Sequence, residues 1–256
     1  FEKCIGEAAP TCTEQNFNPI GTGPFRVVEF RTNDVISYAA NGEYRDPAKP
    51  AFATLVMKGG GDPAAAARSV LETGEYDYAW NTQLAPDVLA GMEAAGKGKV
   101  SAAFGSLVER LHVNMTDPSS SLPEGERSTL KHPHPILSDV NVRKALSMAI
   151  DRQAVIQGAA DGLGVPIGSF YVPGAAGYVD TTGMTPYDPE KARALLKEAG
   201  VAGLSLSMKL PPTPYAKQGG EVIAAMLAKA GITVTLESVE WAQWLSQVYG
   251  KKDYDL

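Results

Sequence analysis

The chain has 256 residues, of which 44% are hydrophobic and 20% are charged, a balance typical of a soluble globular protein of one large or two modest domains. Its formal net charge of −6 disfavours nucleic acids and anionic membranes, because both require a positively charged protein surface. No stretch approaches the roughly 20 apolar residues of a membrane-spanning helix, and no signal peptide is recognised.

Both ends of the sequence resemble internal segments of a longer chain. The first residue is Phe1, not Met, and the final run, KKDYDL, reads like the beginning of a strand. We therefore expect a fragment of a longer protein.

The two cysteines, Cys4 and Cys12, favour a small loop closed by a disulfide. They lack the CxxC spacing of redox motifs, and no further cysteine completes a zinc site. A disulfide predicts a compartment outside the cytoplasm.

The first predicted strand covers residues 25–30 and follows a tight turn made by Gly21, Gly23 and Pro24. The GTGP run resembles a phosphate-binding loop only superficially, because it lacks the third glycine, the lysine and the following helix. A structural turn is the preferred interpretation. Residues 31–50 are polar and predict a surface hairpin or loop.

The segment that follows alternates between short apolar runs and helical patterns. Asp62 and Pro63 form a helix start, as cap and first residue, and Gly74 ends that helix. Alternation of this kind predicts an α/β fold with helices covering a largely parallel sheet. The expected strands are residues 53–57, 76–80, 100–104 and 110–115, the first of them buried, and the second helix is residues 84–95, interrupted at Gly91.

Trp80, Asn81 and Thr82 follow the expected strand 76–80, at the end of the sheet where ligands bind in such folds. The amide and hydroxyl favour a ligand cleft. The alternative for Trp80 is a ring that closes the edge of the core.

Residues 116–138 are rich in Ser and Pro and predict an excursion or a domain boundary. Residues 139–158 predict one long core helix, with apolar residues in a single stripe and Gly158 at its end. A glycine- and proline-rich loop then carries Phe170 and Tyr171, which either contact a ligand or pin the loop to the core.

The last part of the chain predicts a second α/β set. Asp188 caps a helix that Gly200 ends, and the residues of the following strand alternate between apolar and polar. Trp241 and Trp244 are expected in the core. The remaining elements are a strand at 204–210, a helix at about 217–230, a strand at 232–237 and a short amphipathic helix at 241–249.

No arrangement of residues for catalysis is recognised. The chain has three histidines, and His132 and His134 are expected on a surface loop because no third ligand for a metal lies nearby in sequence. Asn114 begins a formal glycosylation sequon, which we interpret as coincidental. We therefore expect no enzyme activity, no metal and no cofactor.

Seven segments resemble, in order, the bacterial extracellular solute-binding proteins of the peptide/nickel type, family 5. Each segment mostly encodes turns and caps, so the resemblance depends on all seven occurring in register. They are NPIGTGPFRV, LETGEYDYAW, ERLHVNMT, LSDVNVRKALSMAIDR, YDPEKARALLKEAG, AAMLAKAGITVTLESVEWAQWL and KKDYDL.

The resemblance implies a periplasmic-binding-protein-like fold of type II, with two lobes of mixed, largely parallel sheets covered by helices. Residues 1–112 correspond to the later part of lobe I and residues 113–256 to lobe II, which ends near the segment that returns to lobe I. It also implies a monomer in the periplasm, or lipid-anchored outside the membrane, that closes on a small molecule or peptide and delivers it to the membrane permease of an ABC importer.

For the ligand site, the resemblance implies an acidic residue beyond this sequence that binds the amine of a peptide. Dipeptide binders also place an arginine in the loop after the strand 204–210, whereas this chain has Thr213, Tyr215 and Lys217 there. The absence of that arginine leaves longer peptides, opines, sugars and metal chelates open. A separate alternative is a sensory module that uses the same fold to signal to a partner without transport. The expected ligand contacts are Trp80, Asn81, Thr82, Phe170, Tyr171, Thr213 and Tyr215.

Overall fold

A computed structural model describes residues 4, 6, 11–59, 61–82, 84–103, 105–201 and 203–256. The chain forms two compact units, the first made of Phe1–Leu84 with Val88–Lys99 and the second of Ala85–Asp87 with Val100–Leu256. The expected disulfide is confirmed, since Cys4 and Cys12 are bonded. The assignment of residues 1–112 and 113–256 to two lobes stays a prediction.

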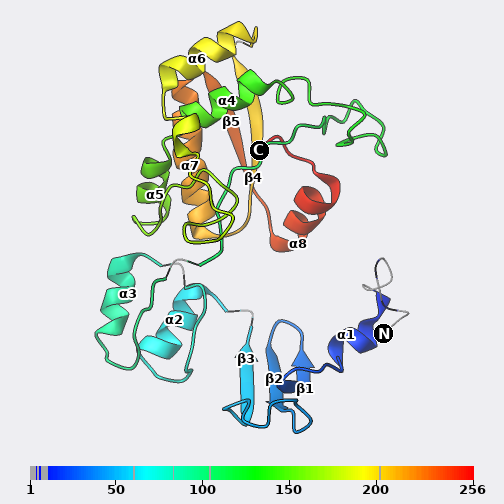
Figure 1. The fold of residues 1–256 in the computed structure, drawn as a ribbon, viewed down its shortest axis with the longest axis vertical. Helices are drawn as coiled ribbons and strands as arrows, with labels where there is room; N and C mark the ends of the chain where they lie inside the picture. Colours follow the sequence, from blue (N-terminus) through cyan, green and yellow to red (C-terminus); the bar gives the residue numbers. More distant parts are fainter. Residues whose placement is uncertain are drawn as a thin grey trace. The chain divides into compact units, whose positions relative to one another are not determined.

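The first unit contains an antiparallel sheet of three strands, β1 (Phe25–Arg31), β2 (Val35–Ala40) and β3 (Thr54–Lys58), in that order (Figure 1). Of residues 31–50, expected as a surface hairpin or loop, residues 35–40 form β2, which pairs with β1, and residues 41–50 form no helix or strand. The predicted burial of β3 is wrong, because every residue of this strand is exposed. A side chain on an edge strand of a thin sheet is buried only where a second layer covers it.

The parallel pairing expected in this half of the chain is also wrong. Residues 76–80 and the described residues 100–103 form no strand, and Tyr78 and Trp80 are 76% and 70% exposed. Residues 110–115 likewise form no strand, apart from a single bridge between Thr116 and Pro133 just beyond them. Alternating aromatic residues predict a pleated face, but a strand also needs a neighbour for its hydrogen bonds.

Helix α2 (Pro63–Leu71) begins as predicted, because the side chain of Asp62 accepts hydrogen bonds from Ala64 N and Ala65 N at 2.9 and 3.0 Å. Helix α3 (Pro86–Glu93) continues through Gly91 without the expected interruption. The two helices form a small hydrophobic cluster of Ala67, Leu71, Leu89 and Met92. A short helix, α1 (Thr13–Phe17), packs Phe17 edge-on against Phe30 at 4.8 Å between ring centroids.

The second unit is built around two parallel strands, β4 (Leu204–Leu210) and β5 (Ile232–Ser238), joined by helix α7 (Pro214–Lys229) (Figure 1). Both strands are confirmed. Helix α7 starts earlier than residue 217, and it packs closely on β4: a Cβ on Gly220 would lie 2.8 Å from Leu210 Cδ1. Helix α6 (Pro189–Glu198) is capped by Asp188 as predicted.

The single helix predicted over 139–158 is wrong, because the chain forms α4 (Val140–Ala149) and then α5 (Arg152–Ala159). Ile150 is extended, with φ −105° and ψ 117°, and the carboxylate of Asp151 caps the first turn of α5. A carboxylate that can cap a new helix competes with continuation of the old one. Gly158 lies inside α5, where a Cβ would meet Val222 Cγ2 at 2.9 Å.

The core of the second unit lies between the β4–β5 sheet and the helices α4, α6 and α7. The predicted stripe of α4 is confirmed in it, with Val142, Ala145 and Ala149 fully buried. Its largest fully buried side chains are Leu137, Leu146, Met208, Leu227, Ile232 and Val142.

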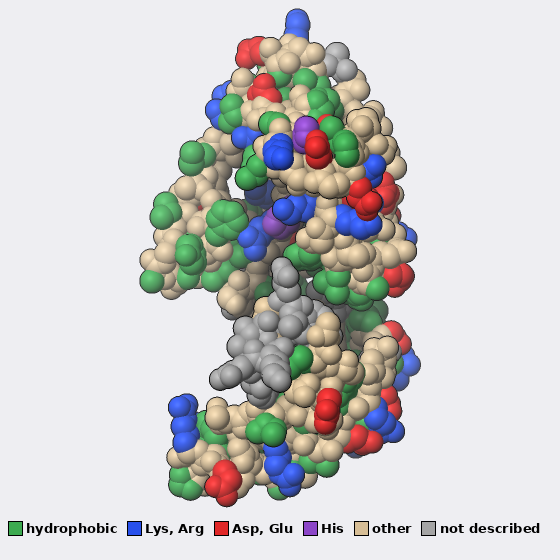
Figure 2. Space-filling model, turned by 90° about the vertical axis from the view of Figure 1, so that its right-hand side faces the viewer, with side chains coloured by type: hydrophobic (Ala, Val, Ile, Leu, Met, Phe, Trp, Pro, Cys, Tyr) green, Lys and Arg blue, Asp and Glu red, His purple; other side chains and the backbone are tan. Residues whose placement is uncertain are grey.

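The helical segment near the end of the chain consists of α8 (Trp241–Gln243) and a π-helix, η4 (Trp244–Lys251). The expected core position of Trp241 is wrong, since it is 52% exposed, and Trp244 is only half-buried. A short 3₁₀ helix, η3 (Thr182–Met184), lies in the aromatic loop. On the face drawn in Figure 2, acidic and basic side chains are interspersed and several hydrophobic side chains are exposed.

Candidate functional site

The seven expected ligand contacts fall in both units. Trp80, Asn81 and Thr82 lie in the first unit, in a segment without regular structure, and Asn81 has a positive φ of 58°. The exposure of Trp80 rules out its alternative role as a closure of the core edge. Phe170, Tyr171, Thr213 and Tyr215 lie in the second unit, where the structure brings three of them into one cluster.

The N-terminus of α7 supplies the polar part of this cluster. Thr213 is the N-cap residue, but its side chain makes no capping bond. Its Oγ1 is buried and makes no hydrogen bond of good geometry to any described residue. It nevertheless lies close to the Tyr215 hydroxyl, and this proximity acts to lower the pKa of that phenol. The first turn of α7 therefore presents two hydroxyl groups together.

Glu109 meets Tyr215 from a distant part of the chain. Burial raises the pKa of the Tyr215 phenol, and the charge of Glu109 raises it further. Burial also raises the pKa of Glu109, against the opposing effects of its hydrogen bond with Tyr215 and of the charge on Arg110. Glu109 as a whole residue is exposed to solvent, whereas its carboxyl group is partly buried.

Arg110 links the same segment to the aromatic loop. Its guanidinium carbon lies 5.2 Å from the centroid of the Phe170 ring, within the range of a cation–π contact. Phe170 is 77% exposed, so this ring does not pin its loop to the core. Tyr171 is 57% exposed and lies against Gly177, where a Cβ would be 2.9 Å from its ring.

We call the group formed by these contacts the Glu109 cluster. It combines an exposed aromatic face, a guanidinium, a partly shielded carboxyl and two hydroxyls, which suits an amphipathic ligand with both apolar and charged groups. Tyr171 lies next to Phe170 in sequence, but its ring lies against Gly177 and is not a member of the cluster. The members of the cluster are Glu109, Arg110, Phe170, Thr213 and Tyr215.

A second polar network joins the segment after Arg110 to the end of the chain. Asn114, which is 6% exposed, donates through Nδ2 to the carbonyl oxygens of Lys252 and Tyr254, both at 2.9 Å. Its backbone N–H donates to Asp255 O at 2.9 Å. Leu256 then continues beside β4, donating to Ser207 O at 3.0 Å. The final residues are thus hydrogen-bonded to Asn114 on one side and to strand β4 on the other.

Asp255 is the centre of this network. One carboxylate oxygen lies 3.2 Å from His134 Nε2, and the other accepts from Ser207 N at 2.7 Å and Ser207 Oγ at 2.9 Å. Burial acts to raise the pKa of Asp255, but the hydrogen bonds from His134 and Ser207 outweigh it, so the pKa is lowered. The carboxylate therefore links the loop of His134 and the C-terminal segment to strand β4.

The expected surface position of His134 is wrong. The residue is 6% exposed, and its Nδ1 accepts from Ile136 N and Leu137 N at 3.1 and 2.8 Å. His132 lies 2.8 Å from Glu126. Within the described residues, no three His, Cys, Asp or Glu side chains come together as a metal site. In the same described ranges, no helix is both long and apolar enough to cross a membrane.

Sequence reasoning missed Glu109, Arg110 and Asp255. Glu109 and Arg110 stand directly before an alternating segment, and two adjacent opposite charges at the start of such a segment are a weak signal. No signal in the sequence marked Asp255, because its hydrogen-bond partners lie far away in the sequence.

Comparison with known proteins identifies relatives over nearly the whole chain. A dipeptide-binding protein of Escherichia coli K12 is 32% identical over 246 residues, covering 93% of this chain and 42% of its own length. Di/tripeptide-binding protein 3 of Pseudomonas aeruginosa is 30% identical over 240 residues, covering 91% of this chain and 41% of its own length. The chain thus spans about two fifths of the length of these curated relatives.

A solved structure confirms the fold. The periplasmic binding protein DppA of Helicobacter pylori, in complex with the peptide STSA, superposes with a TM-score of 0.74 at 24% identity, over 95% of this chain and 45% of that one. The α/β, periplasmic-binding-protein-like fold predicted from the sequence is therefore confirmed. The family of bacterial extracellular solute-binding proteins, family 5, middle part, matches residues 3–256, and the chain belongs to this family.

Proposed function

We propose that the chain is part of the extracytoplasmic solute-binding component of an ABC importer and that it captures a small peptide or a peptide-like solute. The match of residues 3–256 to a family of extracellular solute-binding proteins carries this proposal. The curated relatives, which bind dipeptides and tripeptides, support peptides as the ligand class. The working partner would be a membrane permease, and the protein would act as a monomer without enzyme activity, nucleic acid or cofactor.

The ligand would contact the second unit at the Glu109 cluster. The exposed ring of Phe170 offers apolar contact to a peptide side chain, and Arg110 offers a guanidinium to a ligand carboxylate. Tyr215 offers its hydroxyl to the peptide backbone. Thr213 stays a proposed contact, but its Oγ1 is buried, so its side chain would have to rotate to reach the ligand. Trp80, Asn81 and Thr82 of the first unit, together with Tyr171, remain proposed contacts that would complete the site when the two lobes close on the ligand.

The proposal is tested by native mass spectrometry of the protein purified from its source, followed by calorimetric titration with dipeptides, tripeptides and tetrapeptides. A co-purified peptide and a saturable isotherm are expected. Substitution of Arg110 by Ala should raise the dissociation constant at least about tenfold, equivalent to about 1.4 kcal/mol.

Lys144→Ala is the matched control, because this lysine is exposed and makes no contact with the cluster. The proposal fails if no peptide of any length binds, or if a non-peptide solute is the one that co-purifies. The assignment of the Glu109 cluster alone fails if peptides bind and Arg110→Ala behaves like Lys144→Ala.

A further inference from the structure

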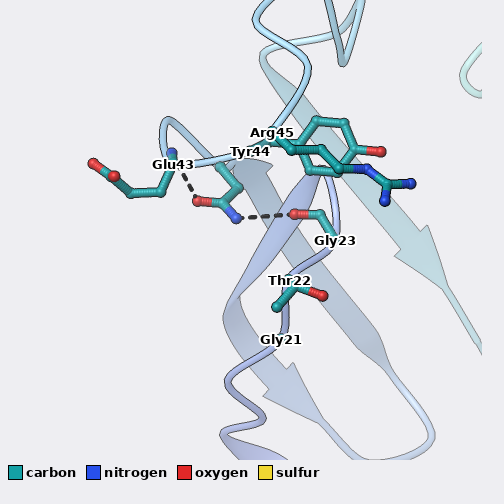
Figure 3. A pocket seen from close by; sticks show the side chains of 7 residues that line it. Gly21, Thr22, Gly23, Glu43, Tyr44 and Arg45 are labelled. Atoms are coloured by element: carbon teal, nitrogen blue, oxygen red, sulfur yellow. Dashed lines mark hydrogen bonds between the residues drawn. The ribbon is translucent and has the colours of Figure 1, made fainter.

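A shallow pocket in the first unit lies apart from the residues discussed so far (Figure 3). One wall is the turn of residues 21–23, and the other is Asn41 together with residues 43–45. Its volume is about 580 Å³, within the range of small-molecule pockets. It is open to solvent on one side, so a ligand could enter without rearrangement of the chain.

Asn41 fixes the two walls relative to each other. Its Nδ2 donates to Gly23 O at 2.9 Å, and its backbone N–H donates to Pro24 O at 2.9 Å. Its Oδ1 accepts from Glu43 N at 3.1 Å, which holds the second wall (Figure 3). These three bonds come from one residue, so the pocket is preformed and a ligand would not have to order it.

The turn presents several donors that the fold leaves without an acceptor. In the described part of the chain, no group accepts from the backbone N–H of Gly21, Thr22 or Gly23, or from the hydroxyl of Thr22. Backbone N–H groups of a turn that have no protein acceptor are free to donate to an anion. The GTGP run is still a structural turn as predicted, because strand β1, and not a helix, follows it.

Arg45 adds a positive charge to these donors. Across the described ranges, no carboxylate lies within ion-pair distance of its guanidinium, which sits 6.0 Å from the centroid of the Tyr44 ring. In Figure 3, the ends of Arg45 and Tyr44 lie on the opposite side of the view from the carboxylate of Glu43. A guanidinium pairs with planar or tetrahedral oxyanions through two parallel hydrogen bonds.

We propose that this pocket binds a small oxyanion, a carboxylate or a phosphate, between the N–H groups of residues 21–23 and the guanidinium of Arg45. The site is distinct from the Glu109 cluster in both residues and unit. A nucleotide is not the expected ligand, because the turn has neither the lysine nor the helix that hold polyphosphates. The proposal does not depend on the transport function.

Backbone amide spectra of the 256-residue chain, labelled with nitrogen-15, test the proposal at each residue. Sodium acetate and sodium phosphate are titrated separately, with sodium chloride added to keep the ionic strength constant. The amides of Gly21, Thr22 and Gly23 should shift with a saturable curve. Tighter binding of phosphate would assign a phosphate-bearing ligand, and tighter binding of acetate would assign a carboxylate.

Two arginine variants provide the decisive comparison. Arg45→Ala should weaken binding at least fivefold, whereas Arg68→Ala should leave it unchanged, because Arg68, on α2, pairs with Glu72 just beyond the end of that helix. Thr22→Ala should weaken binding by a smaller factor. Shifts that increase linearly with both anions, or identical curves for wild type and Arg45→Ala, would overturn the proposal. The same spectra show whether each variant is folded.

Discussion

Replacement of Asp255 by Ala should be among the most destabilising single changes in the second unit. It removes the acceptor for Ser207 N, Ser207 Oγ and His134 Nε2, which lie 2.7, 2.9 and 3.2 Å from the carboxylate. A hydrogen bond to a charged group contributes about 1.5 to 3 kcal/mol, and a buried donor left without an acceptor costs about 1 to 3 kcal/mol. The three bonds share one carboxylate and are not additive, so we expect a loss of about 3 to 4 kcal/mol.

Urea unfolding followed by tryptophan fluorescence measures this loss. The chain has three tryptophans, and a Trp80→Phe background leaves only Trp241 and Trp244, which report on the second unit. With a slope of about 2 kcal/mol per molar urea, the midpoint should fall by about 1.5 to 2 M. Asp253→Ala is the matched control, because that side chain is exposed, and it should change stability by less than about 0.5 kcal/mol.

Wild type and Asp255→Ala should also differ in how their stability depends on pH. The folded-state pKa of Asp255 is lowered, so the unfolded state binds more protons and the carboxylate stabilises the fold above its unfolded pKa of about 3.9. The stability difference between wild type and Asp255→Ala should therefore be constant from pH 7 to about pH 4 and shrink below that. Equal midpoints for Asp255→Ala and Asp253→Ala at pH 7 would refute the reasoning.

Three further changes test the packing and capping described above by urea unfolding at pH 7. Leu227→Ala empties a fully buried site and should cost about 2 to 5 kcal/mol, whereas the exposed Leu245→Ala should cost less than about 0.5 kcal/mol. Gly220→Val forces side-chain atoms against Leu210 and should cost about 1 to 3 kcal/mol, so an unchanged midpoint would mean that α7 moves away easily. Asp62→Ala removes the cap of α2 and should cost about 0.5 to 2 kcal/mol, with Asp62→Asn recovering most of it if capping is the cause.

Local signals predicted the elements that depend on neighbouring residues. The caps at Asp62 and Asp188 and the alternation of Leu204–Leu210 were all correct, because each of these signals acts within a few residues. The break after Ala149 was missed because the apolar stripe continues through Ile150, and only the capping bonds of Asp151 reveal a new start.

Signals that depend on distant partners could not be read from the sequence. The aromatic residues at 76–80 alternate like a strand, but among the described residues no neighbouring strand pairs with them. The Glu109 cluster combines three separate segments, and the sequence had pointed to only Phe170, Thr213 and Tyr215 among its members. Their role as ligand contacts stays a prediction. Buried charge networks such as that of Asp255 leave no periodic pattern, because one carboxylate can collect donors from any part of a chain.

The buried amide of Asn114 has a consequence for the choice of expression host. Asn114 begins an Asn-Met-Thr sequon, and an oligosaccharide attached there would occupy the nitrogen that donates to Lys252 O and Tyr254 O. In a eukaryotic secretory pathway the sugar is added before the chain folds. The glycosylated chain could not bury that side chain, so yeast or insect-cell secretion should yield misfolded material unless Thr116 is first replaced by a residue other than Ser.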